Sequence, residues 1–93
     1  MLGVRRFKGV QIDLWCGDTQ HFVFDTDKLE PNKHVAIKCQ TTDYSAMLET
    51  LRQTLSETPL EKLPRRITLI TNELEEYRKL QTIFFEKFTD SLN

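Results

Sequence analysis

Glycine and proline are scarce in this chain, and cysteine is scarcer still. The 93 residues include three Gly, three Pro and two Cys, while 39% of them are hydrophobic and 29% are charged. This composition excludes a collagen-like chain, a low-complexity linker and a disordered tail. No apolar run approaches the roughly 18 residues of a transmembrane helix, so no membrane partner is expected. At this length, one domain spanning residues 1–93 is expected to hold a single core.

An excess of positive charge is also absent. Thirteen Lys and Arg residues stand against fourteen Asp and Glu residues, which gives a formal net charge of −1. Binding a row of phosphates requires a basic excess, so nucleic acid is not an expected partner. We interpret the basic clusters as solvated charges at strand ends that discourage edge pairing, with phosphate binding as the alternative. These clusters are Arg5, Arg6 and Lys8, and Arg65 with Arg66.

The two cysteines lack the spacing of a metal or redox site. Cys16 and Cys39 lie in segments predicted to be buried, and neither belongs to a Cys-x-x-Cys pair. Both are expected to be reduced core thiols, with a disulfide or a redox role as the alternative. The first residues carry two arginines without a following apolar run, so neither a signal peptide nor an anchor is expected. These features favour a cytoplasmic protein without a metal or cofactor.

Four short segments have the patterns of β-strands. Residues 10–15 alternate apolar and polar side chains, as in a strand with one buried face. Residues 21–24 are rich in aromatic and β-branched side chains and predict a second strand. The apolar run 34–39 predicts an inner strand covered on both faces, and residues 67–71 predict another short strand.

Two helices are predicted between and after the last strands. The first begins at Thr42 or Asp43, either of which can cap it, and it presents one apolar stripe: Tyr44, Met47, Leu48, Leu51 and Leu55. The final helix begins with a capping box of Asn72 and Glu75. Its buried stripe is Leu74, Tyr77, Leu80, Phe84 and Phe88.

The predicted fold is therefore an α/β domain in the order βββαβα, with a mixed sheet of about four strands and two helices. Segments 34–39 and 67–71 flank a helix, so they are expected to pair in parallel as a βαβ unit. Ile83 and Phe85 lie off the final helix's stripe. We interpret them as a wide buried face; the alternative is a homodimer through the C-terminal helix.

Motifs for catalysis are also missing. The chain has no Gly-x-Ser-x-Gly elbow, no Cys-His motif, no P-loop and no Gly-x-Gly-x-x-Gly. His21 and His34 stand at predicted strand starts, where histidines are usually structural rather than catalytic. No calcium-loop spacing occurs among the four aspartates of the first third, so we interpret them as turn formers rather than metal ligands. They are Asp13, Asp18, Asp25 and Asp27.

The loops at the carboxyl ends of the parallel strands are the predicted binding region. They comprise residues 40–43 and 71–72, and both open helices. Helix-start N–H groups, with the hydroxyls of Thr41, Thr42 and Thr71, can hold an anionic group. Ordinary capping uses the same residues and is the favoured alternative.

Three segments around these loops together resemble a shortened macro domain. The first is Gly-Asp-Thr at 17–19, the second is Thr-Thr-x-Tyr at 41–44, and the third is the strand and Asn at 67–72, followed by Glu-Leu-Glu-Glu-Tyr. The resemblance implies that Asp18 recognises adenine and that Asn72 lines the distal ribose. It also implies that the diphosphate of ADP-ribose is wrapped by Thr41, Thr42 and Tyr44.

The chain departs from the macro pattern at the positions that carry ribose recognition and hydrolysis. No Asn-Ala-Ala-Asn segment or Gly-Gly-Val loop occurs between Asp25 and Lys33, and Asp43 replaces the phosphate-loop glycine. The expected protein is thus a reduced, degenerate macro-like scaffold that acts as a non-catalytic binding or protein-interaction module, with an ADP-ribose-type metabolite as the candidate ligand. The alternative is a small hydrolase of a nucleotide-derived metabolite, with a site built from Asp18, Asp25, Thr42 and His34.

Overall fold

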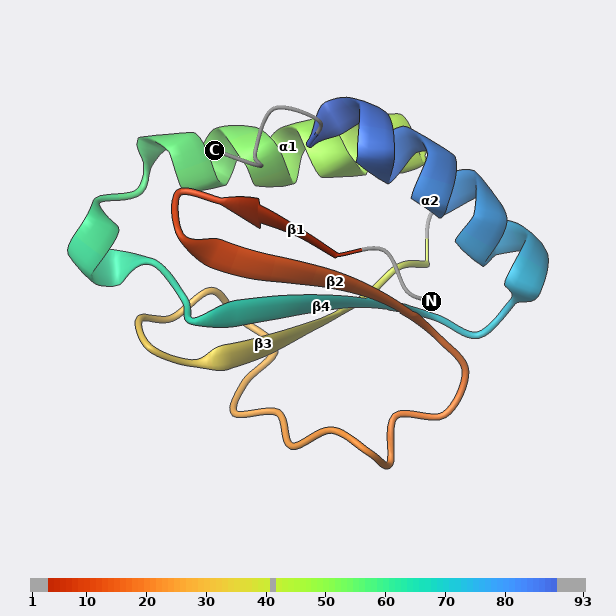
Figure 1. Cartoon of the computed structure of the whole chain (residues 1–93), viewed down its shortest axis with the longest axis horizontal. Coiled ribbons are helices and arrows are strands. Elements are labelled where there is room, and N and C mark those ends of the chain that lie inside the picture. The colour runs from red at the N-terminus through yellow and green to blue at the C-terminus, as the bar shows by residue number, and fades with distance from the viewer. Residues whose placement is uncertain (1–3, 41, 89–93) are drawn as a thin grey trace.

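Every strand of the described chain belongs to one mixed sheet (Figure 1). The structure is a computed structural model and describes residues 4–40 and 42–88. The elements are β1 (Val4–Phe7), β2 (Val10–Cys16), β3 (His34–Lys38), α1 (Tyr44–Glu57), the short 3₁₀ helix η1 (Leu60–Lys62), β4 (Arg66–Thr71) and α2 (Leu74–Lys87). The predicted α/β class and the order βββαβα are confirmed.

The sheet has the strand order β1-β2-β4-β3. β4 pairs in parallel with β2 on one side and with β3 on the other, so the predicted parallel pairing across α1 is confirmed. β1 pairs antiparallel with β2. The expectation that segment 34–39 is an inner strand is wrong, because β3 lies at the sheet edge. The apolar run reflects cover above and below the strand, which does not determine how many hydrogen-bonded neighbours it has.

The strand predicted at 21–24 is also wrong, and β1 supplies the additional strand instead. Beyond the named strands, the described backbone makes one isolated bridge, between Thr26 and Val35. Phe22 and Phe24 stack with ring centroids 5.4 Å apart and are both half-buried. Their aromatic signal therefore reflects packing of a loop on the sheet rather than strand pairing. The sequence pattern does not predict β1, because the charged side chains of Arg5 and Arg6 interrupt the apolar pattern expected of a strand.

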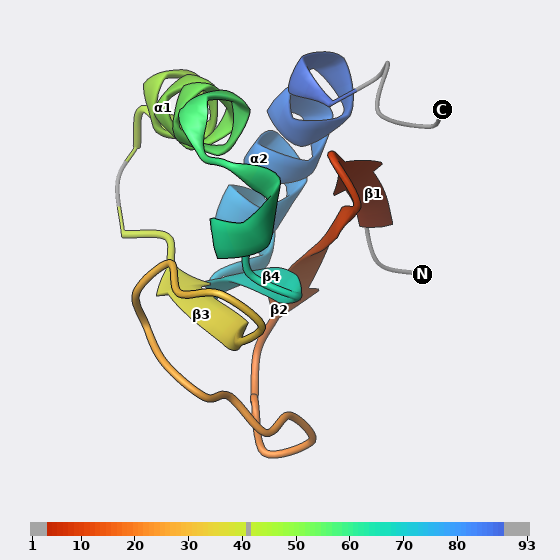
Figure 2. The ribbon, with the colours of Figure 1, turned by 90° about the vertical axis from the view of Figure 1, so that its left-hand side faces the viewer.

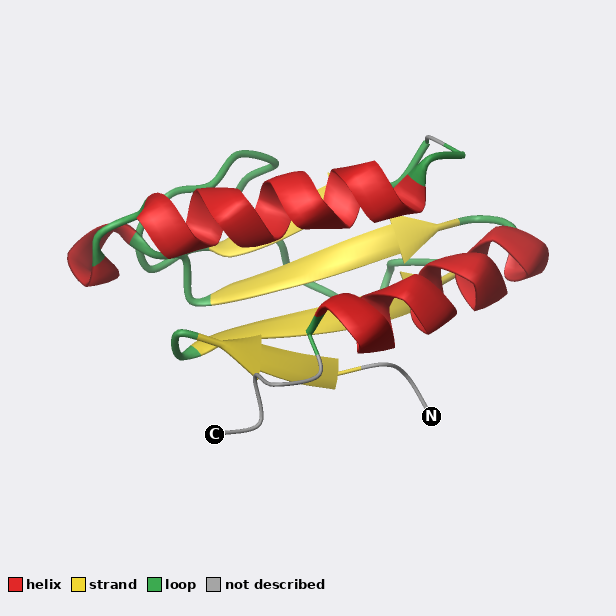
Figure 3. Cartoon of the chain, turned by 90° about the horizontal axis from the view of Figure 1, so that it is seen from above, coloured by secondary structure: helices red, strands yellow, loops and turns green. Residues whose placement is uncertain are grey.

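The two helices cover one face of the sheet, and the loop between β2 and β3 runs along the other (Figures 1 and 2). Seen from above, both helices lie along the sheet (Figure 3). Between these layers lies one apolar core, built mainly from Val10, Ile12, Leu14, Val35, Ile67, Leu69, Leu48, Leu51, Leu55, Leu80, Phe84 and Phe88. The predicted helix stripes are confirmed except at Leu74, which is 56% exposed. Ile83 and Phe85 pack against this core, so the wide buried face is confirmed.

The two helices begin differently. Asp43, one of the two residues predicted to cap α1, accepts a hydrogen bond from the Ala46 N–H at 3.2 Å. The capping box predicted for α2 is wrong: α2 begins at Leu74, and Glu73 occupies the cap position in an extended conformation without a side-chain cap bond. Asn72 comes too early because the ladder of β4 continues through Thr71, whose carbonyl accepts from the Gly17 N–H. The chain must leave the sheet before a helix can start.

The turn between β1 and β2 also contacts the C-terminal end of α1. Lys8 and Gly9 both have positive φ, as a two-residue hairpin turn requires. The Lys8 ammonium donates to the carbonyls of Leu55, Ser56 and Thr58 at 2.9 to 3.1 Å. One cation therefore adds a donor to three carbonyls at the helix end, of which that of Leu55 also accepts from the Thr58 N–H, and complements the negative end of the helix dipole.

We expect Lys8→Met to lower the free energy of unfolding by about 1 kcal/mol, measured by urea denaturation, because it removes this cationic C-cap. Lys28→Met is the matched control. Lys28 is exposed, and within residues 4–40 and 42–88 its ammonium makes no hydrogen bond or ion pair. Equal stability of the two variants would show that Lys8 does not stabilise the helix end.

Candidate functional site

Two adjoining clefts lie at the carboxyl ends of the three parallel strands. The first cleft, of about 280 Å³, is lined by Cys39, Gln40, Thr42, Tyr44, Thr71, Asn72, Glu73 and Glu76. The second cleft, of about 240 Å³, is lined by Gly17, Asp18, Thr19, Lys38, Cys39, Gln40, Ile70, Thr71 and Asn72. The shared residues make this edge of the sheet one continuous site region, at the place where open α/β sheets bind ligands.

Parallel pairing positions this site. Cys16 lies opposite Thr71, and Lys38 lies opposite Ile70, so β2, β4 and β3 end together. Two backbone bonds extend the ladder past the strand ends: the Gly17 N–H donates to the Thr71 carbonyl at 2.9 Å, and the Cys39 N–H donates to the Ile70 carbonyl at 2.8 Å. Gly17 then turns the chain away with φ of 105°, which a glycine adopts without strain.

The residues assigned by the macro resemblance converge here. Thr42 and Tyr44 line the first cleft, Asp18 lines the second, and Asn72 lines both. Thr41 lies outside the described residues. Sequence reasoning missed Glu76, which reaches the first cleft from the first turn of α2, because no local pattern joins it to α1.

A hydrogen bond from Tyr44 to Glu76 closes one side of the first cleft. The Tyr44 hydroxyl donates to the Glu76 carboxylate at 2.7 Å and so links α1 to α2. Burial, together with this carboxylate, raises the pKa of Tyr44 to about 12. Tyr44 therefore stays a neutral donor, and its proton is already committed to Glu76.

The two clefts differ in charge. Glu73 and Glu76 bring carboxylates to the first cleft, where Lys79 approaches Glu76 at 3.7 Å. The second cleft is lined by one acidic and one basic residue, Asp18 and Lys38. The first cleft therefore disfavours a phosphate group more strongly than the second.

The side chain of Thr71 lacks a hydrogen-bond partner. Thr71 is 3% exposed and lines both clefts, and its Oγ1 makes no hydrogen bond within the described chain. A buried hydroxyl without a partner carries a desolvation cost that a ligand's polar group can offset.

The cysteine of the site is inert. Burial raises the pKa of Cys39 to about 11, so the thiol is neutral near neutral pH. Cys39 is buried and Cys16 half-buried, and both are free thiols that pack with the core. The prediction of core thiols is confirmed.

The residues considered for hydrolysis do not meet. Asp18 and Thr42 lie at the carboxyl end of the strands, whereas His34 begins β3 and bonds to Asp25 at the opposite end. Nε2 of His34 lies 2.8 Å from the Thr68 hydroxyl. A histidine and a hydroxyl at this distance resemble the base and the nucleophile of a hydrolase. Thr68 is completely buried, so no substrate can reach it.

The aspartates considered for metal binding are also dispersed. Asp13 pairs with Arg66, and Asp25 pairs with Arg65. Across residues 4–40 and 42–88, no group of three or more His, Cys, Asp or Glu side chains is arranged to hold a metal ion. None of the helices in this part of the chain is long and apolar enough to cross a membrane.

Comparison of the chain with known protein families, with curated proteins and with solved structures finds no match. The resemblance to macro domains therefore stays a prediction that depends on the segments at 17–19, 41–44 and 67–72.

The Tyr44–Glu76 bond can be measured by a double-mutant cycle. We expect Tyr44→Phe and Glu76→Gln to show a coupling free energy of about 1 kcal/mol in urea denaturation, because each removes one partner of the same bond. Tyr77→Phe is the matched control, since the buried Tyr77 hydroxyl has no partner within the described residues. It should leave stability unchanged or raise it. A coupling near zero would contradict the link between the helices.

Proposed function

We propose that the protein is a non-catalytic binding module whose two clefts hold a nucleotide-derived metabolite of the ADP-ribose type. The observation that carries the proposal is the convergence of Asp18, Thr42, Tyr44 and Asn72 on one continuous site region. These residues come from segments distant in sequence, and parallel pairing of the strands brings them together. In the same region the buried Thr71 hydroxyl has no hydrogen-bond partner among the described residues, so it can bond to a polar group of a ligand.

The charges of the clefts favour one orientation of such a ligand. Asp18 uses Oδ1 to accept from the Gln20 N–H at 2.9 Å, which leaves its second oxygen to accept from an adenine amino group. The diphosphate lies beside Lys38, and the terminal sugar lies in the first cleft. Carboxylates and amides there accept hydrogen bonds from hydroxyls but repel phosphates.

The same geometry favours binding over catalysis. The Tyr44 hydroxyl is committed to Glu76, the Cys39 thiol is neutral, and His34 lies at the other end of β3. No described residue in the clefts combines a nucleophile with an adjacent base. The hydrolase alternative therefore lacks an assembled acid-base set among these residues.

Self-association through the C-terminal helix is the alternative interpretation of Ile83 and Phe85. Ile83 and Phe85 pack against their own core, and the Arg5 guanidinium lies 4.3 Å from the centre of the Phe85 ring. Self-association stays a prediction.

Titration with ADP-ribose tests the proposal directly. Trp15 is the single tryptophan, and its indole N–H donates to the Asp18 carbonyl, so its fluorescence reports on the second cleft. We expect a saturable change, unaltered ligand after prolonged incubation by chromatography, and affinity weaker by about tenfold in Asp18→Asn. Asp27→Asn, an exposed carboxylate of the same loop outside both clefts, should bind as the unaltered chain does. The absence of a saturable response in fluorescence and calorimetry would overturn the proposal.

Lys38 provides a separate test of the ligand's orientation. We expect Lys38→Gln to weaken ADP-ribose binding by about tenfold and to leave adenosine binding nearly unchanged, because adenosine has no phosphate. Lys33→Gln is the matched control, because Lys33 directly precedes the amino end of the same strand. Calorimetric titrations at equal ionic strength measure both ligands. Equal weakening of adenosine and ADP-ribose would place the diphosphate elsewhere.

A further inference from the structure

The loop between β2 and β3 is held on the sheet by a row of aromatic rings. Trp15 contacts Phe22 edge-on at 4.8 Å, Phe22 stacks on Phe24 at 5.4 Å, and Phe24 contacts the His34 ring at 4.7 Å. The row begins on β2 and ends on β3, with the loop rings between them. His34 is therefore the fixed end against which the loop docks.

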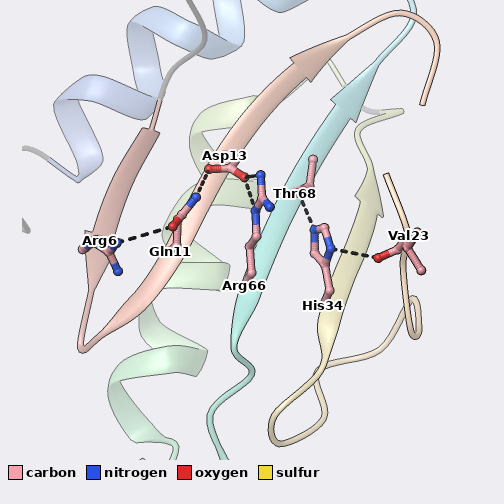
Figure 4. A network of polar contacts seen from close by, with 7 residues as sticks. All are labelled: Arg6, Gln11, Asp13, Val23, His34, Arg66 and Thr68. Carbon is pink, nitrogen blue, oxygen red and sulfur yellow. Dashed lines mark hydrogen bonds and ion pairs between the residues drawn. The ribbon is translucent and has the colours of Figure 1, made fainter. Parts of the chain in front are cut away.

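His34 is buried and makes two hydrogen bonds of opposite sense (Figure 4). Its side chain is only 5% exposed; Nδ1 lies 3.1 Å from the Val23 carbonyl and Nε2 lies 2.8 Å from the Thr68 hydroxyl. A carbonyl can only accept, so Nδ1 carries the proton. Nε2 is then the acceptor of the Thr68 hydroxyl proton, and the neutral imidazole satisfies both partners.

Protonation disrupts this arrangement. An imidazolium donates from both nitrogens, so Nε2 must donate to Thr68 Oγ1. Thr68 is completely buried, and within the described residues its hydroxyl has no other partner to receive the displaced proton. A buried donor is then left without an acceptor, which is costly.

The charges around His34 also disfavour an imidazolium. Arg66 approaches from β4, with its guanidinium 5.6 Å from the centre of the Phe22 ring, and Arg65 and Lys33 lie beside the start of β3. Burial first, and then Arg66, lowers the pKa of His34 below its ordinary value of 6.5.

The nearby carboxylates are already engaged. Asp13 is buried and forms an ion pair with Arg66, whose side chain is 35% exposed. Asp25 accepts from the His34 backbone N–H at 2.8 Å and pairs with Arg65 at 3.5 Å, and the pKa of its carboxyl is lowered chiefly by that backbone bond. Asp13 still favours a charge on the imidazole, but its contribution is smaller than those of burial and Arg66, which disfavour that charge.

We propose that His34 is a proton-controlled clip: the neutral imidazole holds the loop 17–33 on the sheet, and protonation releases the loop and withdraws Asp18 and Thr19 from the second cleft. An imidazolium keeps its Nδ1–H bond to the Val23 carbonyl, so release is driven by the burial of His34 and by the displaced Thr68 hydroxyl proton, because the imidazolium and the hydroxyl both gain water when the loop opens. This release does not depend on any ligand. Only its effect on ligand binding depends on the function proposed above.

The direction of the pH dependence follows from linkage. In the released loop His34 regains its ordinary pKa of 6.5, whereas in the docked loop the pKa is lower. Docking is therefore at full strength above 6.5 and weakens as pH falls below that value, until the pKa of the docked state is passed. The ratio of released to docked loop rises by up to about tenfold for each unit that separates the two pKa values.

Hydrogen exchange of the backbone N–H groups that join loop and sheet tests the clip. These are the N–H of Asp25, bonded to the His34 carbonyl, and the N–H of Ala36, bonded to the Thr26 carbonyl. Between about pH 7.5 and pH 5, we expect their protection factors to fall in the unaltered chain and to stay level in His34→Gln. His21→Gln is the matched control, because His21 is exposed on the same loop and is the only other histidine.

Loss of protection that persists in His34→Gln, or that disappears in His21→Gln, would overturn the proposal. If His34→Gln leaves the loop released at every pH, NMR titration of the unaltered chain decides instead. The Cε1–H signal of His34 and the loop amides should then share one midpoint, below the ordinary histidine pKa value of 6.5. Loop amides that do not change with His34 would contradict the clip.

The link to binding is tested with ADP-ribose at the two ends of the same pH range. Affinity that falls with the loop's protection supports the link, and the fall should be absent in His34→Gln. Equal affinity at both pH values, despite a released loop, would overturn the link to the cleft. Absence of binding at both pH values would refute the proposed function while leaving the release of the loop, which is measured without ligand, intact.

Discussion

Parallel hydrogen bonding of β4 to β2 on one side and to β3 on the other is the constraint on which the rest of the structure depends. Because the three strands run in one direction, the chain must return over the sheet between β3 and β4, and α1 makes that return. The same direction brings three carboxyl ends to one edge. Both clefts follow from this arrangement, since their linings come from the segments that leave those strand ends.

The two faces of the sheet are stabilised by different interactions, apolar burial on one and hydrogen bonds between buried polar groups on the other. The face under the helices is apolar, with Ile12, Leu14, Ile67 and Leu69 completely buried. The opposite face buries Asp13, His34 and Thr68, each with a hydrogen-bond partner. Apolar burial supplies most of the stability, whereas buried polar groups are tolerated only while they stay paired. The polar face is therefore the one that a change of protonation can affect.

One loop connects the two ends of the sheet. It leaves β2 at the clefts with Gly17 and Asp18, crosses the open face through Phe22 and Phe24, and enters β3 at His34. Its backbone makes few ladder bonds, so its position depends on aromatic contacts and on the His34 hydrogen bonds. Segments of this kind belong to the least stable part of a fold and are the ones that move most readily.

The sequence by itself determined the α/β class, the two helices and most of their buried stripes, and it narrowed the cap of α1 to Thr42 or Asp43, because these depend on local periodicity and on neighbouring residues. It predicted the order βββαβα with one strand misplaced, at 21–24 instead of β1. It also identified four described residues that line the clefts. Only the tertiary structure decided that β3 is an edge strand, that Phe22 and Phe24 belong to a loop, and that Tyr44 meets Glu76. An aromatic or apolar run indicates that a segment is covered, but which surface covers it is decided by contacts between residues far apart in the chain.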